Sequence, residues 1–425
     1  MTTESTKRDI PFNRPFIAGK ELYYVAQAVT LGQLAGDGHY TQACARLLEE
    51  RFSIPKVLMT PSCTAALEMA AALCELKQGD EVIMPSYTFV STASAFVREG
   101  ATPVFVDVRP DTLNIDENLI EQAITDRTKA ICVVHYAGVG CEMDKIMAVA
   151  KKHNLIVIED AAQGVNAFYK DKALGSFGDL GCYSFHETKN YICGEGGALC
   201  INNPELAERS EILRDKGTNR QRFLRQQVDK YTWVDVGSSY VPSELCSAFL
   251  YGQLEEMDRI SERRKSIFDR YSSMLSEQEA AGYLQLPSIP DACKSNYHLF
   301  FVVVPTAQLR TNLLEYLYER GVNAVFHYVP LHHSPKGREL VSTDVSLPVT
   351  EDISSRLLRL PFFHDLDEDD QDYVASTLLD GVEQLSPQSF RLDGQQKASW
   401  PHFVARDTRR HGGRSQHHGR SGRRH

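Results

Sequence analysis

Short apolar runs rich in β-branched residues alternate with longer stretches of helical periodicity, and this alternation constrains the fold most strongly. A parallel strand pairs with the next only after a crossover, usually a helix, so the pattern predicts a mostly parallel sheet covered by helices. Runs 131–134 and 155–158 are almost continuously apolar, as fully buried parallel strands are. The runs that we expect to form a seven-stranded sheet are 56–59, 81–84, 103–108, 130–134, 155–159, 181–185 and 198–201. The fold class is therefore α/β.

The pattern changes after Val241, where a long helical stretch covers 243–275. A strand candidate at 297–304 and a helix candidate at 308–320 follow it. We therefore predict a large α/β domain with an N-terminal arm over residues 1–250 and a smaller α+β domain over 251–390. Between the predicted strands, 64–76 and 143–153 have helical spacing.

The net charge of −10 is unevenly distributed. Residues 391–425 carry nine Lys or Arg and two Asp, a net +7, which leaves −17 for the remainder. This basic segment is too poor in apolar residues to pack, so we expect a disordered tail. The acidic body argues against nucleic-acid binding.

No apolar run approaches the roughly 20 residues that cross a bilayer. Residues 1–14 are polar and charged and lack the apolar stretch of a secretory signal, so we expect a cytoplasmic protein. The ten cysteines are scattered and form no CxxC pair, which predicts reduced, buried thiols. We expect no metal, because the paired His332 and His333 have no Cys or carboxylate at a matching ligand spacing.

A pair of acids, Glu159 and Asp160, ends one predicted strand. A carboxylate at the carboxyl end of a parallel strand can enter a ligand cleft. Asp160 could hold a protonated pyridine nitrogen, which would make an attached cofactor ring a better electron sink. A helix-capping or ion-pairing role is the alternative for this residue.

Lys189 follows another predicted strand, with Ser184 five residues before it and a glycine-rich segment, 194–197, after it. A lysine whose pKa is lowered by burial or nearby charge can attack an aldehyde. Together with Asp160, this combination predicts a phosphate-bearing aldehyde cofactor. The glycine segment is not GxGxxG and precedes a strand, which disfavours a dinucleotide site.

The segment 61–67 follows a predicted strand and begins a helix. The free N–H groups of a helix N-terminus favour phosphate, so Thr64 and Ala65 are candidate phosphate contacts. Ordinary N-capping by Ser62 or Thr64 explains the segment equally well.

These motifs resemble the sugar aminotransferases of the DegT/DnrJ/EryC1/StrS type, over about residues 10–385. The resemblance implies the aspartate-aminotransferase-like fold type I, pyridoxal 5'-phosphate as cofactor, and a homodimer with shared active sites. The segments that carry it are 11–13, 36–38, 61–65, 85–89, 159–163, the Lys189 motif and 327–332.

The resemblance also implies roles for single residues. Lys189 would bond the cofactor aldehyde, Asp160 would pair with the pyridine nitrogen, and Gln163 would lie beside the phenolic oxygen. Phe89 would stack on the ring unless it is simply core, and Ser239 or Val241 stands where many relatives have an Asn that reaches the partner's phosphate. The implied cofactor contacts are Thr64, Ala65, Phe89, Asp160, Gln163, Ser184, Lys189 and Ser239; the implied substrate contacts are His186, His327, Tyr328 and His332.

Segments 184–190, 216–220 and 231–240 most resemble family members that form dTDP-4-amino-4,6-dideoxy-D-galactose in enterobacterial common antigen or lipopolysaccharide biosynthesis. This implies dTDP-4-dehydro-6-deoxy-D-glucose as acceptor and L-glutamate as amino donor. Alternatives are amination at C3 or another nucleotide carrier. A cofactor-dependent sugar dehydratase is disfavoured because relatives of that kind replace the lysine with histidine, and a non-catalytic binding module would have a broken site.

Overall fold

The structure is a computed structural model that describes residues 8–341 and 345–386. These residues belong to one compact unit, Met1–Pro387, so the domain boundary near residue 250 stays a prediction. The predicted basic tail lies outside the described residues. Within the described part, no helix combines the length and apolar character that crossing a membrane requires, and the cytoplasmic location stays a prediction.

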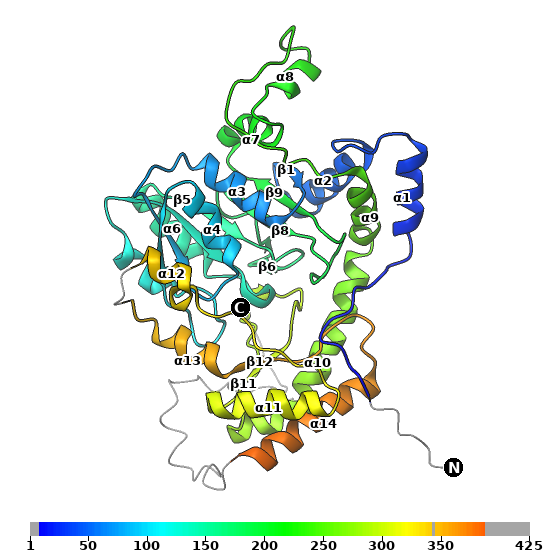
Figure 1. The fold of residues 1–425 in the computed structure, drawn as a ribbon, viewed down its shortest axis with the longest axis vertical. Coiled ribbons are helices and arrows are strands. Elements are labelled where there is room, and N and C mark those ends of the chain that lie inside the picture. The colour runs from blue at the N-terminus through cyan, green and yellow to red at the C-terminus, as the bar shows by residue number, and fades with distance from the viewer. Residues whose placement is uncertain (1–7, 342–344, 387–425) are drawn as a thin grey trace, which may run out of the picture. The chain divides into compact units, whose positions relative to one another are not determined.

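One mixed sheet contains all seven predicted strands (Figure 1). Its order is β1-β9-β8-β5-β4-β2-β3. The pairs β2–β3, β2–β4, β4–β5 and β5–β8 are parallel, and β9 is antiparallel to both β1 and β8. The mostly parallel seven-stranded sheet is therefore confirmed. Its strands are β1 (Lys56–Thr60), β2 (Glu81–Pro85), β3 (Thr102–Val106), β4 (Thr128–Val134), β5 (Ile156–Asp160), β8 (Leu180–Ser184) and β9 (Gly197–Ile201).

Helices surround this sheet, and two small sheets accompany it. The small sheets contain β6 (Phe168–Tyr169), β7 (Lys172–Ala173) and β10 (Cys293–Lys294), and β11 (Phe301–Val303) with β12 (Leu357–Arg359). The helices are α1 (Glu21–Thr30), α2 (His39–Phe52), α3 (Cys63–Leu73), α4 (Val90–Arg98), α5 (Glu117–Ile120), α6 (Met143–His153), α7 (Ala207–Arg214), α8 (Arg220–Leu224), α9 (Glu244–Leu254), α10 (Met257–Ala281), α11 (Ala307–Glu319), α12 (Pro335–Leu340), α13 (Pro348–Arg356) and α14 (Glu368–Leu385). The 3₁₀ turns are η1 (Glu121–Ala123), η2 (Tyr136–Gly138), η3 (Pro204–Leu206) and η4 (Leu331–His333).

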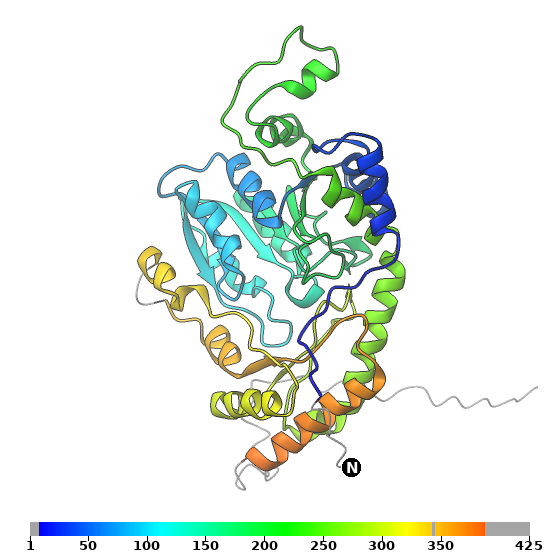
Figure 2. The ribbon, with the colours of Figure 1, turned by 45° about the vertical axis from the view of Figure 1, so that its right-hand side comes forward.

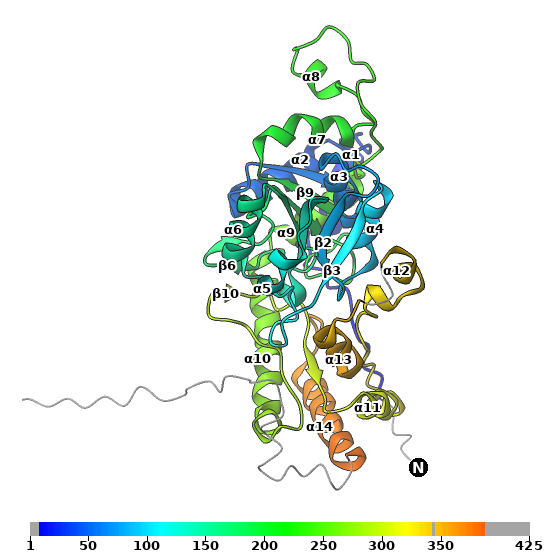
Figure 3. The ribbon, with the colours of Figure 1, turned by 90° about the vertical axis from the view of Figure 1, so that its left-hand side faces the viewer.

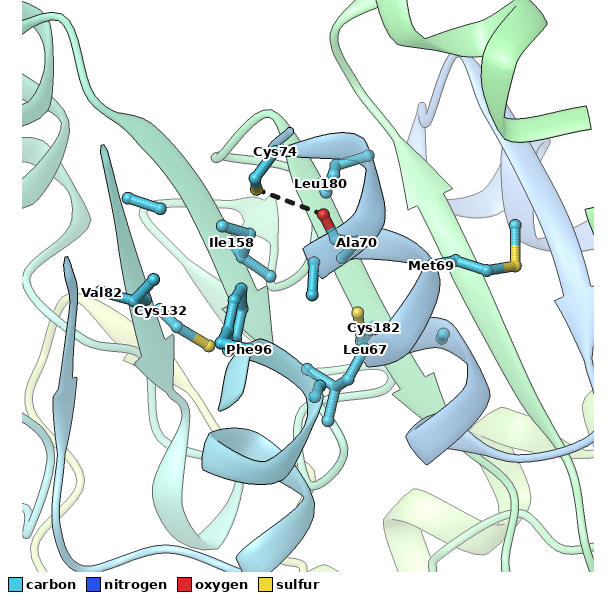
Figure 4. Packing of buried hydrophobic residues seen from close by; sticks show 14 of the residues in the cluster. Leu67, Met69, Ala70, Cys74, Val82, Phe96, Cys132, Ile158, Leu180 and Cys182 are labelled. Carbon is cyan, nitrogen blue, oxygen red and sulfur yellow. Dashed lines mark hydrogen bonds between the residues drawn. The ribbon is translucent and has the colours of Figure 1, made fainter. Parts of the chain in front are cut away.

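Helix α3 packs its small residues against the sheet (Figure 4). Leu67 and Ala70 of α3 share one buried cluster with Cys132 of β4 and Cys182 of β8. Alanines along this face let the helix approach the strands closely, and the thiols behave as small apolar groups. All ten cysteines are free and most are buried, as the sequence predicts.

The predicted helical stretch 243–275 is two helices, because α9 ends at Leu254 and α10 begins at Met257. At the break, Glu255 accepts hydrogen bonds from Lys20 and Tyr24, and α1 lies along α9 (Figure 2). The second helix, α10, then runs from the sheet to the C-terminal elements α11 and α14 (Figure 3). Ile267, Tyr271 and Leu275 of α10 lie in the second large core, whose strand is β11.

The carboxyl ends of the parallel strands meet at one edge of the sheet. Val134 ends β4 beside Asp160, which ends β5, and the pairing of β5 with β8 places Ser184 at the same edge. Gly197 begins the antiparallel β9 there, paired with both Thr60 and Ser184. A Cβ on Gly197 would lie 2.4 Å from the carbonyl carbon of Ser62, so the start of α3 needs glycine at this position.

We predict that Gly197→Ala destabilises the protein by about 1–3 kcal/mol, because the added carbon must displace backbone at the start of α3. The check is the free energy of unfolding from denaturant titration. Gly164→Ala is the matched control, since its Cβ would meet only side-chain atoms, no nearer than 3.3 Å. Equal losses in the two variants would contradict this account of Gly197.

Candidate active site

A cavity of about 450 Å³ opens at the carboxyl edge of the sheet. This volume falls in the range of small-molecule sites. Both halves of the chain contribute to its wall, so the site depends on their packing. Its polar lining comprises Asn13, Ser62, Cys63, Thr64, Thr88, Ser91, Asp160, Gln163, Ser184, His186, Thr188, Lys189, Glu195, His298, His327, Tyr328 and Arg359.

Asp160 is a buried carboxylate at the end of β5, with 5% of its surface exposed. Thr92 Oγ1 donates a hydrogen bond to its Oδ2 at 2.7 Å, and the Ala162 N–H donates to its Oδ1 at 3.2 Å. Burial raises the pKa of Asp160, while Thr92, the Ala162 N–H and the Lys189 charge oppose that rise. The carboxylate lines the cavity, where it can face a bound cation.

Lys189 lies in the connection between β8 and β9, and its partly buried side chain lines the cavity. This connection folds back on itself, because the Phe185 N–H donates to the Gly196 carbonyl and the Glu187 N–H donates to the Gly194 carbonyl. Burial lowers the pKa of the Lys189 amine. Among the described residues, the amine has neither a hydrogen bond nor an ion pair, so a nucleophilic nitrogen is available to a ligand.

The start of α3 forms another wall. Ser62 caps the helix by accepting a hydrogen bond from the Ala65 N–H at 3.1 Å, so the capping interpretation is correct for Ser62. Thr64 Oγ1 is instead 2.8 Å from Ser91 Oγ of α4. The cavity therefore has the hydroxyls of Ser62, Thr64, Ser91 and Ser184 in its wall, together with a helix N-terminus, a set of groups that suits a phosphate.

Gln163 fixes the position of an aromatic wall. Its Oε1 accepts from the Ala137 N–H at 2.7 Å, and its Nε2 donates to the Tyr328 hydroxyl at 2.9 Å. The Tyr328 ring stacks on His327, with 3.7 Å between ring centroids. Tyr136 hydroxyl lies 2.7 Å from His327 Nδ1. Burial lowers the pKa of His327 well below its usual range, so its imidazole is neutral near pH 7.

Phe89 precedes α4 and lines the cavity with 57% of its surface exposed. The alternative that it is simply a core residue is therefore wrong. An exposed ring beside Tyr328, with 6.5 Å between their centroids, is free to stack on a planar ligand. His186 also lines the cavity and pairs with Glu195 at 3.7 Å.

Three predicted site residues do not line the cavity. Ala65 is buried in α3, and Ser239 is exposed in a bridge with Asp215. His332 is buried beside Ser86, and its Nδ1 lies 2.7 Å from Ser86 Oγ. The roles assigned to these three residues stay predictions.

Two cavity residues, His298 and Arg359, and one residue that supports the cavity, Thr92, carry no signal in the sequence. His298 lies 2.8 Å from Asn190 Oδ1, and burial lowers its pKa well below the usual range. Arg359 of β12 places a guanidinium in the wall, 4.6 Å from the centroid of Phe12. Thr92 of α4 reaches Asp160 across 68 positions of sequence. No local motif marks any of them, because each acquires its place through packing between distant segments.

These residues fit pyridoxal 5'-phosphate by their chemistry. The Lys189 amine, whose pKa is lowered and which no other described side chain binds, can bond the aldehyde carbon. A buried carboxylate can pair with the pyridine nitrogen, and hydroxyls with a helix N-terminus can hold the phosphate.

Comparison with known proteins decides the family. The model of the DegT/DnrJ/EryC1/StrS aminotransferase family matches residues 15–379. The chain belongs to this family. It is 32% identical to the spore coat polysaccharide biosynthesis protein SpsC of Bacillus subtilis, over 88% of this chain and 97% of SpsC.

Solved structures agree with this assignment. Spr1654 from Streptococcus pneumoniae in its PMP-form superposes with a TM-score of 0.83 at 27% identity, covering 89% of this chain and 100% of that one; it has also been solved in a PLP-form. Helicobacter pylori PseC, an aminotransferase involved in the biosynthesis of pseudoaminic acid, gives 0.82 at 26% identity, with the same coverage. The fold is therefore type I, the cofactor is pyridoxal 5'-phosphate, and the protein is a sugar aminotransferase, as the sequence predicts.

We predict that Thr92→Val shifts the acid limb of the aminotransferase pH profile to higher pH. Loss of the hydroxyl removes a donor that lowers the pKa of Asp160, so the carboxyl stays protonated to a higher pH. A hydrogen bond to a charged group contributes about 1.5 kcal/mol or more, so the acid limb should move up by about one pH unit. The measurement is kcat/KM against pH.

Thr377→Val is the control for this substitution. Thr377 is equally a buried threonine, but its hydroxyl donates to the Tyr373 carbonyl in α14. If the acid limb is unchanged in Thr92→Val, Thr92 does not lower the pKa of Asp160.

Proposed function

We propose that this aminotransferase transfers the amino group of L-glutamate to C4 of dTDP-4-dehydro-6-deoxy-D-glucose, giving dTDP-4-amino-4,6-dideoxy-D-galactose and 2-oxoglutarate. The single observation that carries the proposal is the Lys189 amine, which has no partner among the described residues and lies in one cavity with Asp160. The choice of sugar is supported by the motifs in 184–190, 216–220 and 231–240. The reaction would belong to enterobacterial common antigen or lipopolysaccharide synthesis in the cytoplasm.

Pyridoxal 5'-phosphate, when bound, supplies an aldehyde carbon that exchanges oxygen for nitrogen and a ring that accepts the electron pair of a breaking C–H bond. Asp160 would hold the pyridine nitrogen in its protonated form. Lys189 would accept the proton from the α-carbon of glutamate and later deliver a proton to C4 of the sugar. Because its pKa is lowered, the amine can act in both directions near neutral pH.

Other side chains in the cavity wall would bind the sugar nucleotide. His186 and the neutral imidazole of His327 offer hydrogen-bonding nitrogens, and Tyr328 offers a hydroxyl held in place by Gln163. Arg359 adds positive charge for an anionic group. Phe89 would stack on the cofactor ring.

We predict that Lys189→Ala reduces turnover by about 100- to 10,000-fold, because both proton transfers lose their acid and base. In the wild type, glutamate should remove the visible absorbance of the bound cofactor and the keto sugar should restore it. Lys170→Ala removes an exposed lysine that pairs with Asp144 and should behave as wild type.

The product decides the regiochemistry. Mass and NMR analysis should place the new amino group at C4 in the galacto configuration. A product with the amino group at C3 would contradict the proposed substrate and indicate a 3-keto sugar in its place. An absorbance spectrum that glutamate leaves unchanged would contradict glutamate as donor.

We also propose a homodimer in which each active site borrows residues from the partner. Large apolar side chains are exposed on α1 and in the segment after α8, which projects beyond the sheet (Figure 3). Leu22, Trp233 and Val236 are 73%, 73% and 78% exposed. Large apolar side chains exposed to this extent favour burial against another chain.

We predict that Trp233→Asp weakens the dimer and lowers activity in parallel, because a charge replaces apolar contact area. Sedimentation should show the wild type at twice the 47.8 kDa chain mass and the variant shifted toward one chain. Tyr318→Asp is the control: Tyr318 is 70% exposed on α11, at the other end of the fold from α8 (Figure 1). A monomeric, fully active wild type would contradict the shared site.

A further inference from the structure

Two adjacent histidines and a glutamate converge outside the catalytic cavity. His332 and His333 lie on η4, and Glu351 lies on α13. Glu351 Oε1 is 3.2 Å from His332 Nε2 and 3.7 Å from His333 Nε2. One ligand atom from each residue lies within 4.8 Å of the others. None of the three residues lines the cavity.

These separations suit a small tetrahedral metal ion. Ligand atoms about 2.0–2.1 Å from tetrahedral Zn²⁺ lie about 3.3 Å from one another. The distance from Glu351 to His332 already agrees, and the distance from Glu351 to His333 is a few tenths of an ångström longer. The ligand atoms of all three residues lie within 4.8 Å of one another, so a shared ion requires them to move closer together through side-chain rotation.

Two of the three side chains, His332 and Glu351, are held in place by hydrogen bonds to other groups. His332 is 4% exposed, and its second ring nitrogen, Nδ1, lies 2.7 Å from Ser86 Oγ. Ser86 Oγ also accepts the His332 N–H at 3.1 Å. Glu351 Oε1 accepts the Leu347 N–H at 3.0 Å. A hydrogen bond from the far nitrogen of a ligating histidine is the usual support of a metal site, because it fixes ring orientation and tautomer.

We propose that His332, His333 and Glu351 bind one divalent transition-metal ion of the zinc class. Two imidazoles and one carboxylate suit Zn²⁺ and its neighbours, whereas Mg²⁺ and Ca²⁺ prefer all-oxygen sets. Three protein ligands leave a fourth position for water. The His333 and Glu351 side chains are 45% and 33% exposed, which gives the ion a path from solvent.

The bound ion would connect two segments that also form the catalytic cavity. Four residues separate His327 from His332, so η4 follows directly from the loop that carries the aromatic wall. Helix α13 leads into β12, whose last residue is the cavity residue Arg359. The ion would therefore hold in place the part of the cavity wall that contains His327 and Arg359. It would not take part in the transfer of the amino group.

The test is Zn²⁺ binding by the full-length holoenzyme, stripped of metal and titrated in competition with a chromophoric chelator. His333→Ala and Glu351→Gln should each lose one bound equivalent or bind it at least tenfold more weakly than the wild type. Glutamine keeps the oxygen that accepts the Leu347 N–H, so Glu351→Gln leaves the local fold intact. Ser86→Ala, which removes the support of His332, should weaken binding by about 10-fold or more.

His153→Ala is the matched control. His153 also lies beside a glutamate, with Nε2 2.8 Å from Glu121 Oε1, but no third ligand joins this pair among the described residues. Comparing variants in the full chain also removes the contribution of other histidines, including those after residue 400. Wild-type affinity and stoichiometry in both His333→Ala and Glu351→Gln, or an equal loss in His153→Ala, would overturn the proposal.

Amide hydrogen exchange gives an independent readout. Zn²⁺ should slow exchange in 331–341 and 345–356 of the wild type and leave His333→Ala unchanged. If Zn²⁺ alters exchange in neither segment of the wild type, the proposed connection between η4 and α13 is wrong.

Discussion

The site depends on a carboxylate, that of Asp160, which is buried and must be stabilised there by its neighbours. An ionised group out of water is costly unless it is hydrogen-bonded or paired. Here the described residues give it two donors, Thr92 and the Ala162 N–H, and no salt bridge. Thr92 is in turn 2.8 Å from Thr88, so the start of α4 supports the end of β5. Because no described residue balances the charge of this carboxylate with a salt bridge, it favours a cofactor whose pyridine ring is protonated.

The sheet edge brings the other groups to this carboxylate. Parallel strands end together, so the segments after β1, β2, β4 and β8 reach one place although they are far apart in sequence. The antiparallel β9 begins at the same edge, and the glycines before it let the Lys189 connection fold back on itself. The C-terminal elements then complete the wall with His298, Tyr328 and Arg359. One cavity thus depends on two separately packed cores.

Local pattern was sufficient for much of the fold. Each of the seven strands lies within two residues of its predicted limits, because buried parallel strands need unbroken apolar runs whatever their neighbours are. The break between α9 and α10 was missed. The backbone leaves the helical conformation at Glu256, next to Glu255, whose contacts are with Lys20 and Tyr24, more than 200 residues earlier.

The sequence by itself determined which residues to expect in the site. An acid at a strand end, a lysine after a serine, and glycines before the next strand are local signals, and the two residues that they mark, Asp160 and Lys189, line one cavity. Only the tertiary structure decided what surrounds them. Thr92, His298 and Arg359 join the site, His332 lies outside it, and Glu351 meets the paired histidines. Side-chain contacts between distant segments depend on strand order and helix packing, and no sequence spacing encodes these.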